Sequence, residues 1–436
     1  DELRFDSLTP EFFPYELDNV FCTLKYGRDQ ITITNLQGRH GTSQLRIGPT
    51  LLIVKPDGGM WARIRSLQLV PFVPDDDLLR ALPNGLRSVF ETLQPSGPIS
   101  MSADLLVVDL APRQLEPRRQ RVPGSNRQVR MSSALAQDRD ELTTWLYWEN
   151  AGLTFAGATV KLGVTWDQVY GEFASRGEYR NGQLGAVDGN LLFKSARILK
   201  QPVQQVHAKL LIDPGQEAGV LKIKNFRAQM YGGELGGEGR IQLDPLEYRL
   251  SLKGVQFQLE EIARQNRIGD GAELKGVATA QLVLMGTGSD LRNLRGGGTI
   301  DVPKGRLYNL PLMLDLLKFA KLRAPDGTAF EEAHAAFTIH GRRMHLDQFE
   351  LLGNLISLTG EGDIQLDNLQ AHLDIYTVWS RLVQMLPGPG KEISNAISRN
   401  LFRMELNGTL DGKVQFQQQA IPFLVDPVKR LMERMK

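Results

Sequence analysis

The stretch that decides the fold is Phe349 to Ile375, FELLGNLISLTGEGDIQLDNLQAHLDI, because an earlier stretch repeats it nearly position for position. The earlier copy, Phe226 to Leu252, reads FRAQMYGGELGGEGRIQLDPLEYRLSL and aligns without a gap at a constant offset of 123 (349 − 226). Ile31 to Leu36 repeats the pattern of Leu221 to Phe226, so a third, fainter copy opens the chain. Self-similarity of this length indicates a repeated structural unit.

Apolar and polar residues alternate in each copy. Ile241 and Leu243 flank Gln242, for example, and the second copy repeats this pattern. A period of two is typical of a strand with one face toward water. Asp-Pro at 244 and Asp-Asn at 367 predict turns. Bulges or bends are predicted at the glycines that interrupt the strands: Gly237, Gly239, Gly360 and Gly362. The repeated unit is therefore an antiparallel meander.

The composition is that of a large globular protein. The chain has 436 residues, of which 42% are apolar and 23% charged. Because 51 Lys and Arg nearly balance 50 Asp and Glu, no net charge steers the protein toward nucleic acid, and nucleic-acid binding is not expected. The single cysteine, Cys22, cannot form an intrachain disulfide. No apolar run of 18 residues or more predicts a membrane-spanning helix.

Helical periodicity breaks the strand pattern at a few places. Four or five strands are expected from Tyr15 to Pro71, and more from Thr143 to about Phe257. Between them Asp75 to Asp77 can cap a helix whose apolar stripe, Leu78 to Leu93, is broken at Pro83. Other helices are predicted at Leu259 to Arg267, Pro311 to Leu322, Leu382 to Leu401 and, in the tail, Asp426 to Lys436.

These patterns predict a mainly β protein with a long antiparallel sheet and a few short helices at its edge or ends. Together with the resemblance described below, the expected fold is a long twisted antiparallel sheet curled into a hydrophobic groove. The expected organisation has four segments. They are a first β-groove segment with one helix and a basic loop (1–145), a middle β-groove segment (146–270), a carboxyl-terminal segment (271–421) and an amphipathic tail helix (422–436).

No pattern predicts catalysis or a cofactor. Neither GxSxG nor HExxH occurs, no GxxxxGK[ST] is present, and isolated carboxylates such as Asp301 and Glu361 sit on alternating polar faces. His334 and His340 could point to the same face of one strand, but a metal site there would need a third ligand. The glycine run Gly296 to Gly298 fits sheet bending better than a phosphate loop. We expect a protein that is not an enzyme and holds no metal.

The apolar face of such a sheet needs a cover, and the predicted helices are too few and short to provide it. A barrel or a sandwich would hide the face, and so would a trough that holds lipid acyl chains. A charge at Leu366 or Ile375 in an open trough should block lipid passage with modest loss of folding. The residues predicted to contact lipid are Leu210, Ile212, Leu221, Ile223, Ile241, Leu243, Leu282, Leu284, Ile300, Val302, Phe337, Ile339, Leu346, Leu358, Ile364, Leu366, Leu373, Ile375, Met404 and Leu406.

Three stretches resemble the carboxyl-terminal region of the AsmA-like family of bacterial envelope proteins. They are GGGTIDVPKGRLYNLPLMLDLLK from Gly296, AAFTIHGRRMHLDQFELLGNLISLTGEGDIQLDNLQAHLDIY from Ala335, and FRMELNGTLDGKVQF from Phe402. The resemblance covers the last third well and the first 145 residues loosely. It implies a β-groove related to bridge-like lipid transfer proteins, which moves phospholipid between inner and outer membranes. It also implies a periplasmic, cell-envelope location and a membrane anchor upstream of Asp1.

Two other functions compete with lipid transport. One is a structural or assembly factor of the cell envelope that acts through protein contacts. The other, an outer-membrane barrel, is disfavoured by the low Tyr and Trp content and the interposed helices. The Arg-rich stretch 112–130 is either a solvated loop or a patch for acidic head groups. The tail helix either caps the sheet or docks on a membrane surface.

Overall fold

The structure, a computed structural model, describes the chain apart from several segments. Those left undescribed are residues 11–12, 29, 111–142, 163, 181, 199, 244, 267–273, 289, 308–329, 354–355, 369, 380–401, 410–413, 421–426, 428–429 and 431–436. The described part contains two compact units. Unit 1 comprises Asp1–Lys224 and Gln242–Asp244, and unit 2 comprises Asn225–Ile241 and Pro245–Lys436. The division into four segments expected from the sequence stays a prediction.

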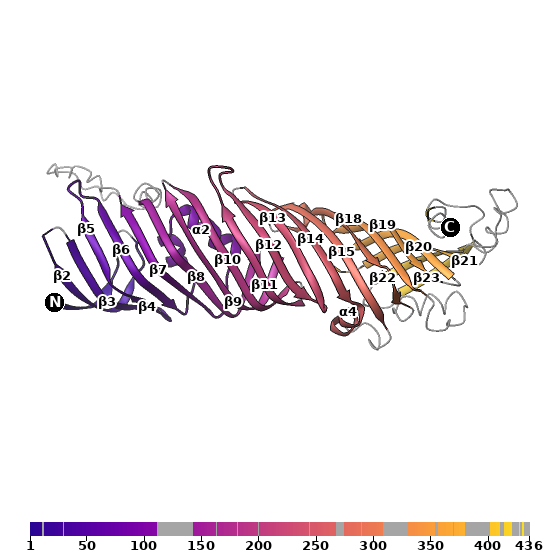
Figure 1. Ribbon diagram of the computed structural model, residues 1–436, viewed down its shortest axis with the longest axis horizontal. Helices are drawn as coiled ribbons and strands as arrows, with labels where there is room; N and C mark the ends of the chain where they lie inside the picture. Colours follow the sequence, from indigo (N-terminus) through magenta and orange to yellow (C-terminus); the bar gives the residue numbers. More distant parts are fainter. Residues whose placement is uncertain are drawn as a thin grey trace, which may run out of the picture. The chain divides into compact units, whose positions relative to one another are not determined.

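Unit 1 is an antiparallel meander in which strands that follow one another in sequence pair with one another (Figure 1). The exception is β3, which pairs with both β4 and β5, and these two in turn pair with β6. Its strands are β1 (Glu2–Leu8), β2 (Leu17–Tyr26), β3 (Gln30–His40), β4 (Ser43–Ile47), β5 (Thr50–Val54), β6 (Met60–Val70), β7 (Ile99–Leu110), β8 (Thr143–Leu162), β9 (Val164–Arg180), β10 (Gln183–Ile198) and β11 (Gln201–Ile212).

Unit 2 continues the same construction. Its pairing order is β14, β15, β16, β18, β19, β20, β21, β22 and β23, and the short β17 pairs with β15. Two strands, β12 (Val220–Met230) and β13 (Gly233–Leu243), contribute residues to both units. The others are β14 (Leu246–Gln258), β15 (Lys275–Thr287), β16 (Arg295–Val302), β17 (Gly305–Arg306), β18 (Glu332–His340), β19 (Arg343–Leu352), β20 (Ile356–Gln365), β21 (Gln370–Trp379), β22 (Phe402–Thr409) and β23 (Val414–Ala420).

The helices of the described part are short. The stripe expected from Leu78 to Leu93 forms α1 (Asp76–Ala81) and α2 (Asn84–Leu93), which separate at Pro83. Asp75 caps α1, its carboxylate accepting a hydrogen bond from the Leu78 N–H at 2.8 Å. In unit 2, α4 (Leu259–Asn266) confirms the helix predicted after β14, and the 3₁₀ turn η1 (Leu291–Asn293) precedes β16.

The sequence repeat has a structural counterpart in a local irregularity of its strands: the register shifts in β3 and in β19, and β12 has a left-handed residue at the aligned position. Asn35 in β3 and Asn225 in β12 occupy aligned positions, and both adopt a left-handed backbone with φ of 56° and 53°. The position aligned with them in β19 is Gln348, where the register shifts between Leu346 and Phe349. In β3 and β19 the extra residue of the bulge interrupts the ladder locally and increases the twist of the strand.

Gly360 and Gly362 do not provide a bulge themselves, which corrects that part of the expectation from the sequence, and the bulges or bends expected at Gly237 and Gly239 stay predictions. Gly360 and Gly362 pair in register with Ile375 and Leu373, and the bulge lies in the neighbouring strand β19. The triplet Gly296 to Gly298 likewise continues the ladder in register between β15 and β18. These glycines make room for bulky neighbours: a Cβ at Gly360 would lie 2.4 Å from the Phe349 ring, and one at Gly298 would lie 2.8 Å from the Phe337 ring. The bends expected at them stay a prediction.

The predicted fold class is confirmed: the protein is mainly β, its strands are antiparallel, and the described helices are few and short. The basic stretch 112–130 and the helices predicted at 311–322 and 382–401 lie outside the described residues. Of the tail, Pro427 and Arg430 are described, and both have a helical backbone.

Candidate functional site

The candidate site is the apolar face of the unit 2 sheet, which the strand registers define residue by residue. One row of facing positions crosses five strands, from Leu282 through Gly298, Phe337 and Leu346 to Gly362. It continues through β21 and β22 at Leu373 and Leu406. A parallel row joins Ile300 in β16 to Ile375 in β21 and Met404 in β22, through positions on the strands between them. Alternation predicted these residues to share a face, and the registers place them on one.

Exposure along this face changes from one end to the other. Toward β21 and β22 the side chains are buried: Ile375 is 2% exposed, Leu406 1% and Met404 0%. Around the middle of β15 and β16 the same face is open, since Ile300 is 42% exposed and Leu282 is half-buried, whereas Ala278 and Val302 on these strands are buried. The apolar face is therefore a packed core toward β21 and β22 and along the row through Val302, and a solvent-accessible surface around Ile300, here called the open end.

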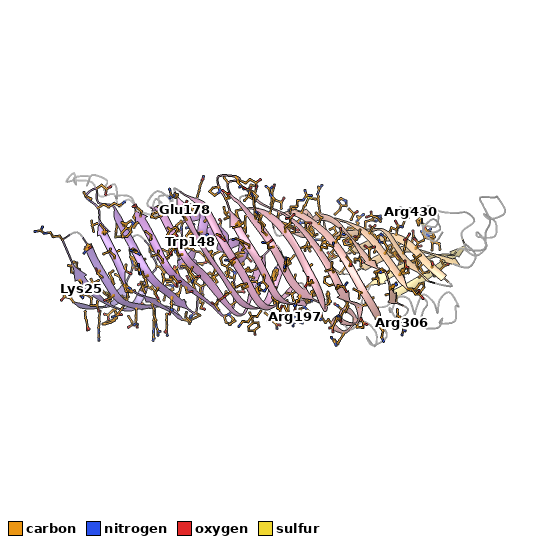
Figure 2. All side chains as sticks on the ribbon, in the orientation of Figure 1. Lys25, Trp148, Glu178, Arg197, Arg306 and Arg430 are labelled. Atoms are coloured by element: carbon orange, nitrogen blue, oxygen red, sulfur yellow. The ribbon has the colours of Figure 1, made fainter. Side chains whose placement is uncertain are left out.

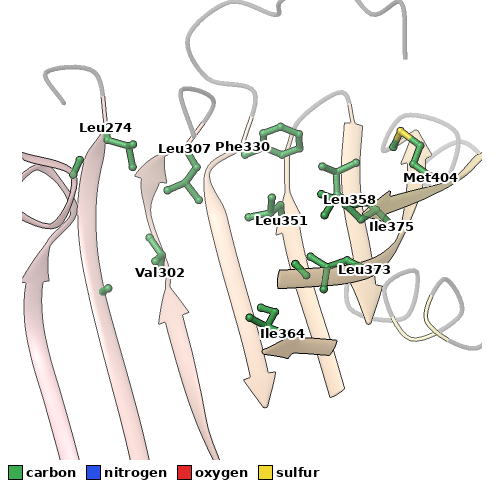
Figure 3. Packing of buried hydrophobic residues seen from close by; sticks show 14 of the residues in the cluster. Leu274, Val302, Leu307, Phe330, Leu351, Leu358, Ile364, Leu373, Ile375 and Met404 are labelled. Carbon is green, nitrogen blue, oxygen red and sulfur yellow. The ribbon is translucent and has the colours of Figure 1, made fainter. Parts of the chain in front are cut away.

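The packed end is a single apolar cluster, shown in Figure 3. It joins Phe257 in β14 to Leu406 in β22, so the apolar side chains of widely separated strands pack together around a curled sheet. Each fully buried aliphatic side chain there contributes about 1.5–3 kcal/mol to folding. The expectation that a charge at Ile375 would be tolerated, as on an open trough wall, is therefore wrong, because protein atoms surround that side chain.

The open end is lined by small residues beside larger ones. Ile300 pairs with Ala280 on β15 and with Ala335 on β18, so its side chain stands above two methyl groups. Gly298 faces the Phe337 ring: a Cβ at Gly298 would lie 2.8 Å from the ring. The larger apolar side chains here project above neighbours that are alanine or glycine, and their other side faces water. An apolar ligand could therefore bury them.

The opposite face of unit 2 carries several pairs of oppositely charged or hydrogen-bonding side chains. Arg403 on β22 donates two hydrogen bonds to the Asp374 carboxylate on β21, at 2.9 and 2.8 Å. His345 Nδ1 lies 2.9 Å from an Asp363 carboxylate oxygen, and Asp363 is also the register partner of His372. These charged positions are suited to water, but the same face is buried at Glu350 (1% exposed), Thr359 (0%) and Tyr376 (6%), which lie in the register row of Arg403.

Unit 1 has an apolar face of its own, and α2 lies against it. Tyr179, on β9, is 0% exposed, and a Cβ at Gly85 of α2 would lie 3.0 Å from its ring. Phe90 of α2 packs on Phe72 with ring centroids 5.5 Å apart. Figure 1 shows α2 against strands β8 to β10, and Figure 2 marks Trp148 on β8, which is buried. This part of the face is covered by the protein itself.

The structure places every predicted lipid-contacting residue. On the apolar face of unit 2, the buried ones are Val302, Ile339, Leu358, Ile364, Leu373, Ile375, Met404 and Leu406. The half-buried ones on that face are Leu282, Leu284, Phe337 and Leu346, and Ile300 is exposed. Leu366 lies in the turn after β20, half-buried, its N–H donating to the Arg342 carbonyl at 2.8 Å. Outside this set, Ile212 is buried, and Leu210, Leu221, Ile223, Ile241 and Leu243 are half-buried.

Several residues of this face were missed, among them Met344, Phe349 and Leu351 on β19. Leu250 and Leu252 on β14 pair with Leu284 and Leu282, which puts them on the apolar face, and both are half-buried. The repeat could have found them, since its offset aligns them with Leu373 and Ile375. The gap-free alignment therefore places more residues on this face than the alternation within single strands does.

The histidines and the tail take ordinary structural positions. His334 and His340 share the polar face of β18, and His334 Nδ1 lies 2.5 Å from Asp301. Within the described ranges no three His, Cys, Asp or Glu side chains gather as metal ligands do. Arg430 in the tail pairs with Glu361 on β20 at 3.8 Å (Figure 2), and Pro427 is buried. Of the helices that the structure describes, none has the length and apolar character needed to cross a bilayer.

The chain was compared with known proteins at three levels. No protein-family model, no curated protein and no solved structure matches it. The geometry of the sheet and its two faces is therefore the basis for assigning a function.

Proposed function

We propose that this protein is a segment of a bridge-like lipid transfer protein, which holds phospholipid acyl chains on its apolar sheet face during transport between the inner and outer membranes of a cell envelope. The proposal includes no covalent step, metal or cofactor. It includes a periplasmic location and attachment to a membrane by a segment upstream of Asp1. The resemblance to AsmA-like proteins agrees with it.

The observation that carries the proposal is the exposed apolar surface at the open end of unit 2. Ile300 keeps 42% of its surface exposed although it lies in the middle of a strand, on the face whose other end is a packed core. Exposing an aliphatic side chain at such a position costs free energy, which a bound acyl chain would recover at about 25 cal/mol for each Å² buried. Acyl chains have the flexibility to fill an uneven apolar surface without directional contacts.

The polar face supports the same function. Several of its carboxylates are engaged by cations on neighbouring strands, as Asp374 is by Arg403, so the exposed part of this face is suited to remain in water while the other face holds lipid. A lipid on the apolar face would keep its head group at the rim of the sheet, in solvent. Such binding selects for chain length and apolarity more than for head-group identity.

The test compares two aspartate substitutions at exposed aliphatic residues on opposite faces of adjacent strands. Ile300→Asp places a charge on the apolar face, and Met285→Asp places one on the polar face of β15, where Met285 is 38% exposed and pairs with Arg249 and Arg295. The two positions have similar exposure, so we expect both variants to fold. Lipids that co-purify with each variant are counted by mass spectrometry, and transfer of a fluorescent phospholipid between vesicles is measured.

We expect Ile300→Asp to reduce retained phospholipid and transfer about tenfold or more, because an acyl chain would have to desolvate the carboxylate. Met285→Asp should behave as the unsubstituted protein does. Equal effects of the two substitutions would contradict the proposal, and so would the absence of phospholipid from the unsubstituted protein. The second of these results would favour a structural or assembly role in the envelope instead.

A further inference from the structure

The hairpin tips at one rim of unit 1 carry exposed apolar side chains. Tyr26, the last residue of β2, is 69% exposed, and Val54, the last residue of β5, is 53% exposed. Of the large apolar side chains that the structure describes, these two are the most exposed. The two tips adjoin, because β3 and β5 pair in a register that places Gln30 opposite Ile53 (Figure 1). A partner that buried both side chains would gain their hydrophobic free energy.

Both side chains lie where the apolar face of unit 1 reaches this rim. The row of facing positions that begins at Tyr26 continues to Leu52 and to Ala62, which is 3% exposed. Val54 lies two residues beyond Leu52 on β5 and therefore on the same face. The apolar face is thus closed at Ala62 and open at the tips.

Tryptophans gather at the same rim on the opposite face. Trp61 on β6 and Trp145 on β8 are both register partners of Asp109 on β7, and both are half-buried. Neighbouring strands lie about 4.8 Å apart, so strand pairing brings these two residues to within roughly 10 Å although they are far apart in the sequence. Trp and Tyr concentrate at membrane–water interfaces, where their rings lie among the head groups and their polar atoms stay hydrated.

Two cations flank Tyr26 without a partner. Lys25 and Arg28 are exposed, and no carboxylate among the described residues lies within ion-pair distance of either. Each Lys or Arg close to an anionic membrane strengthens binding about fivefold. Because the formal net charge of the chain is only +1, this attraction is a property of the rim rather than of the whole protein.

The described carboxylates of the rim are engaged. Asp109, between the two tryptophans, pairs with Lys55, and Glu178 on β9 pairs with Arg180 at 2.9 Å. Asp57 accepts a hydrogen bond from a backbone N–H of its own hairpin tip at 2.8 Å. These charges are therefore largely compensated, and they do not oppose the approach of anionic lipid to Lys25 and Arg28 as free carboxylates would.

We propose that this rim docks on the surface of an anionic membrane. Tyr26 and Val54 enter among the lipid head groups, Lys25 and Arg28 contact lipid phosphates, and the two tryptophans lie at the level of the head groups on the other face. Docking would join the apolar face of unit 1 to the bilayer and so give lipid a path between them. That purpose rests on the proposed function, whereas the docking itself does not.

A membrane accounts for these features together, which strand pairing and a protein partner do not. A further strand adds along the lateral edge of a sheet, so it leaves hairpin tips at the strand ends uncovered. A partner protein that packs on one face would leave the side chains of the other face exposed. A lipid surface yields around whatever enters it, so it covers apolar and aromatic side chains on both faces of the rim at once.

Flotation of the full chain with vesicles tests the charges of the rim. The chain should bind vesicles of phosphatidylcholine mixed with phosphatidylglycerol, and less so as salt is added. The variant K25E/R28E should bind at least about tenfold more weakly. K194E/R197E is the matched control, because it reverses two exposed cations with the same spacing near the end of β10, at the opposite rim, and should bind as the unsubstituted chain does.

The apolar contact is tested in the same assay. Tyr26→Asp should weaken binding about tenfold, because the carboxylate would have to leave water. Tyr170→Asp is the matched control: Tyr170 is 48% exposed on β9, away from the tips, and its replacement should leave binding unchanged. Absence of binding by the unsubstituted chain, or equal losses in the rim variants and their controls, would overturn the proposal.

Tryptophan fluorescence identifies which rim meets the membrane. Brominated phospholipid in the vesicles should quench the unsubstituted chain, and W61F/W145F should lose most of this quenching. Trp166→Phe, at the start of β9 on the opposite rim, should lose none, and the reverse result would refute the docked orientation. Co-purifying phospholipid is counted separately. A chain that retains phospholipid but binds no vesicles overturns the docking alone, and a chain that binds vesicles through this rim but retains no phospholipid supports the docking and contradicts the proposed function.

Discussion

Replacing Gly360 by alanine should loosen the packed end of unit 2, and the structure gives the size of the effect. A Cβ at Gly360 would lie 2.4 Å from the Asp374 carbonyl oxygen and 2.4 Å from Cε1 of the Phe349 ring. The carbonyl belongs to the β21 ladder, and Asp374 is held in place by Arg403, so the backbone has little freedom to withdraw. Overpacking of this kind costs about 1–3 kcal/mol.

Two contributions set the net change. Both contacts are far inside van der Waals distance and one is to backbone, which places the cost near the upper end, about 3 kcal/mol. Alanine recovers about 0.5–1 kcal/mol because it loses less conformational entropy than glycine on folding. We therefore expect a net destabilisation of about 2 kcal/mol, which corresponds to hydrogen exchange about 30-fold faster for the amides of β20 and β21.

A second glycine, Gly236, provides the control for this prediction, and the Phe349 ring provides a test of its cause. At Gly236 the nearest atom to a new Cβ is the Phe226 carbonyl at 3.6 Å, an ordinary contact, so Gly236→Ala should leave exchange unchanged or slow it. Gly360→Ala should also cost less in a Phe349→Ala background, since one of the two collisions is then absent. Unchanged protection of β20 in Gly360→Ala would refute the reasoning, and an equal cost in both backgrounds would show that the ring has no part in it.

Three further results are expected. Ile375→Asp, at a side chain 2% exposed, should destabilise unit 2 by about 4 kcal/mol or more, whereas Ile300→Asp should cost less than about 1 kcal/mol; denaturant titration followed by hydrogen exchange compares them. Burial, with the nearby Asp75 carboxylate, raises the pKa of Tyr15 from its ordinary value of 10.0 to about 12, so the folded state favours the neutral hydroxyl. This shift contributes about 2–3 kcal/mol to the free energy of unfolding below pH 10, and the contribution is lost as the pH rises from 10 to 12. In Tyr15→Phe the melting temperature should therefore fall less steeply over that range. The same steep fall in Tyr15→Phe would contradict the assignment. Asp75→Ala removes the cap of α1 and should cost about 1 kcal/mol in thermal unfolding, and no loss would mean that the Leu78 N–H finds another acceptor.

Much of the fold could be predicted because each strand carries its own signal. Alternation marked the strands, the aspartates before Leu78 marked the start of a helix, and Pro83 marked the break in its apolar stripe, where the structure has two helices instead of one. The shared face of unit 2 followed from the same alternation. A period of two is a local property of the chain, and it stays visible whatever the strand later packs against.

Coverage of the face could not be predicted. Ile300 and Ile375 have the same kind of sequence surroundings, yet one is 42% exposed and the other 2%. The difference depends on which residues far away in the sequence pack over each position, and no local pattern records that. The role of Gly360 was missed for a related reason, since the atom that excludes a side chain there is a ring on another strand.

Pairing between sequence neighbours also has a consequence for how the length of such a protein can change. Within each unit most strands bond to the strands just before and after them, so a hairpin could be inserted or deleted without changing the partners of distant strands. Two strands at a time preserve the alternation of faces, and the apolar surface would grow or shrink by about 9–10 Å with each hairpin. Duplication of a segment, as the repeat between Phe226 and Phe349 records, is a direct genetic route to a longer sheet of the same chemistry.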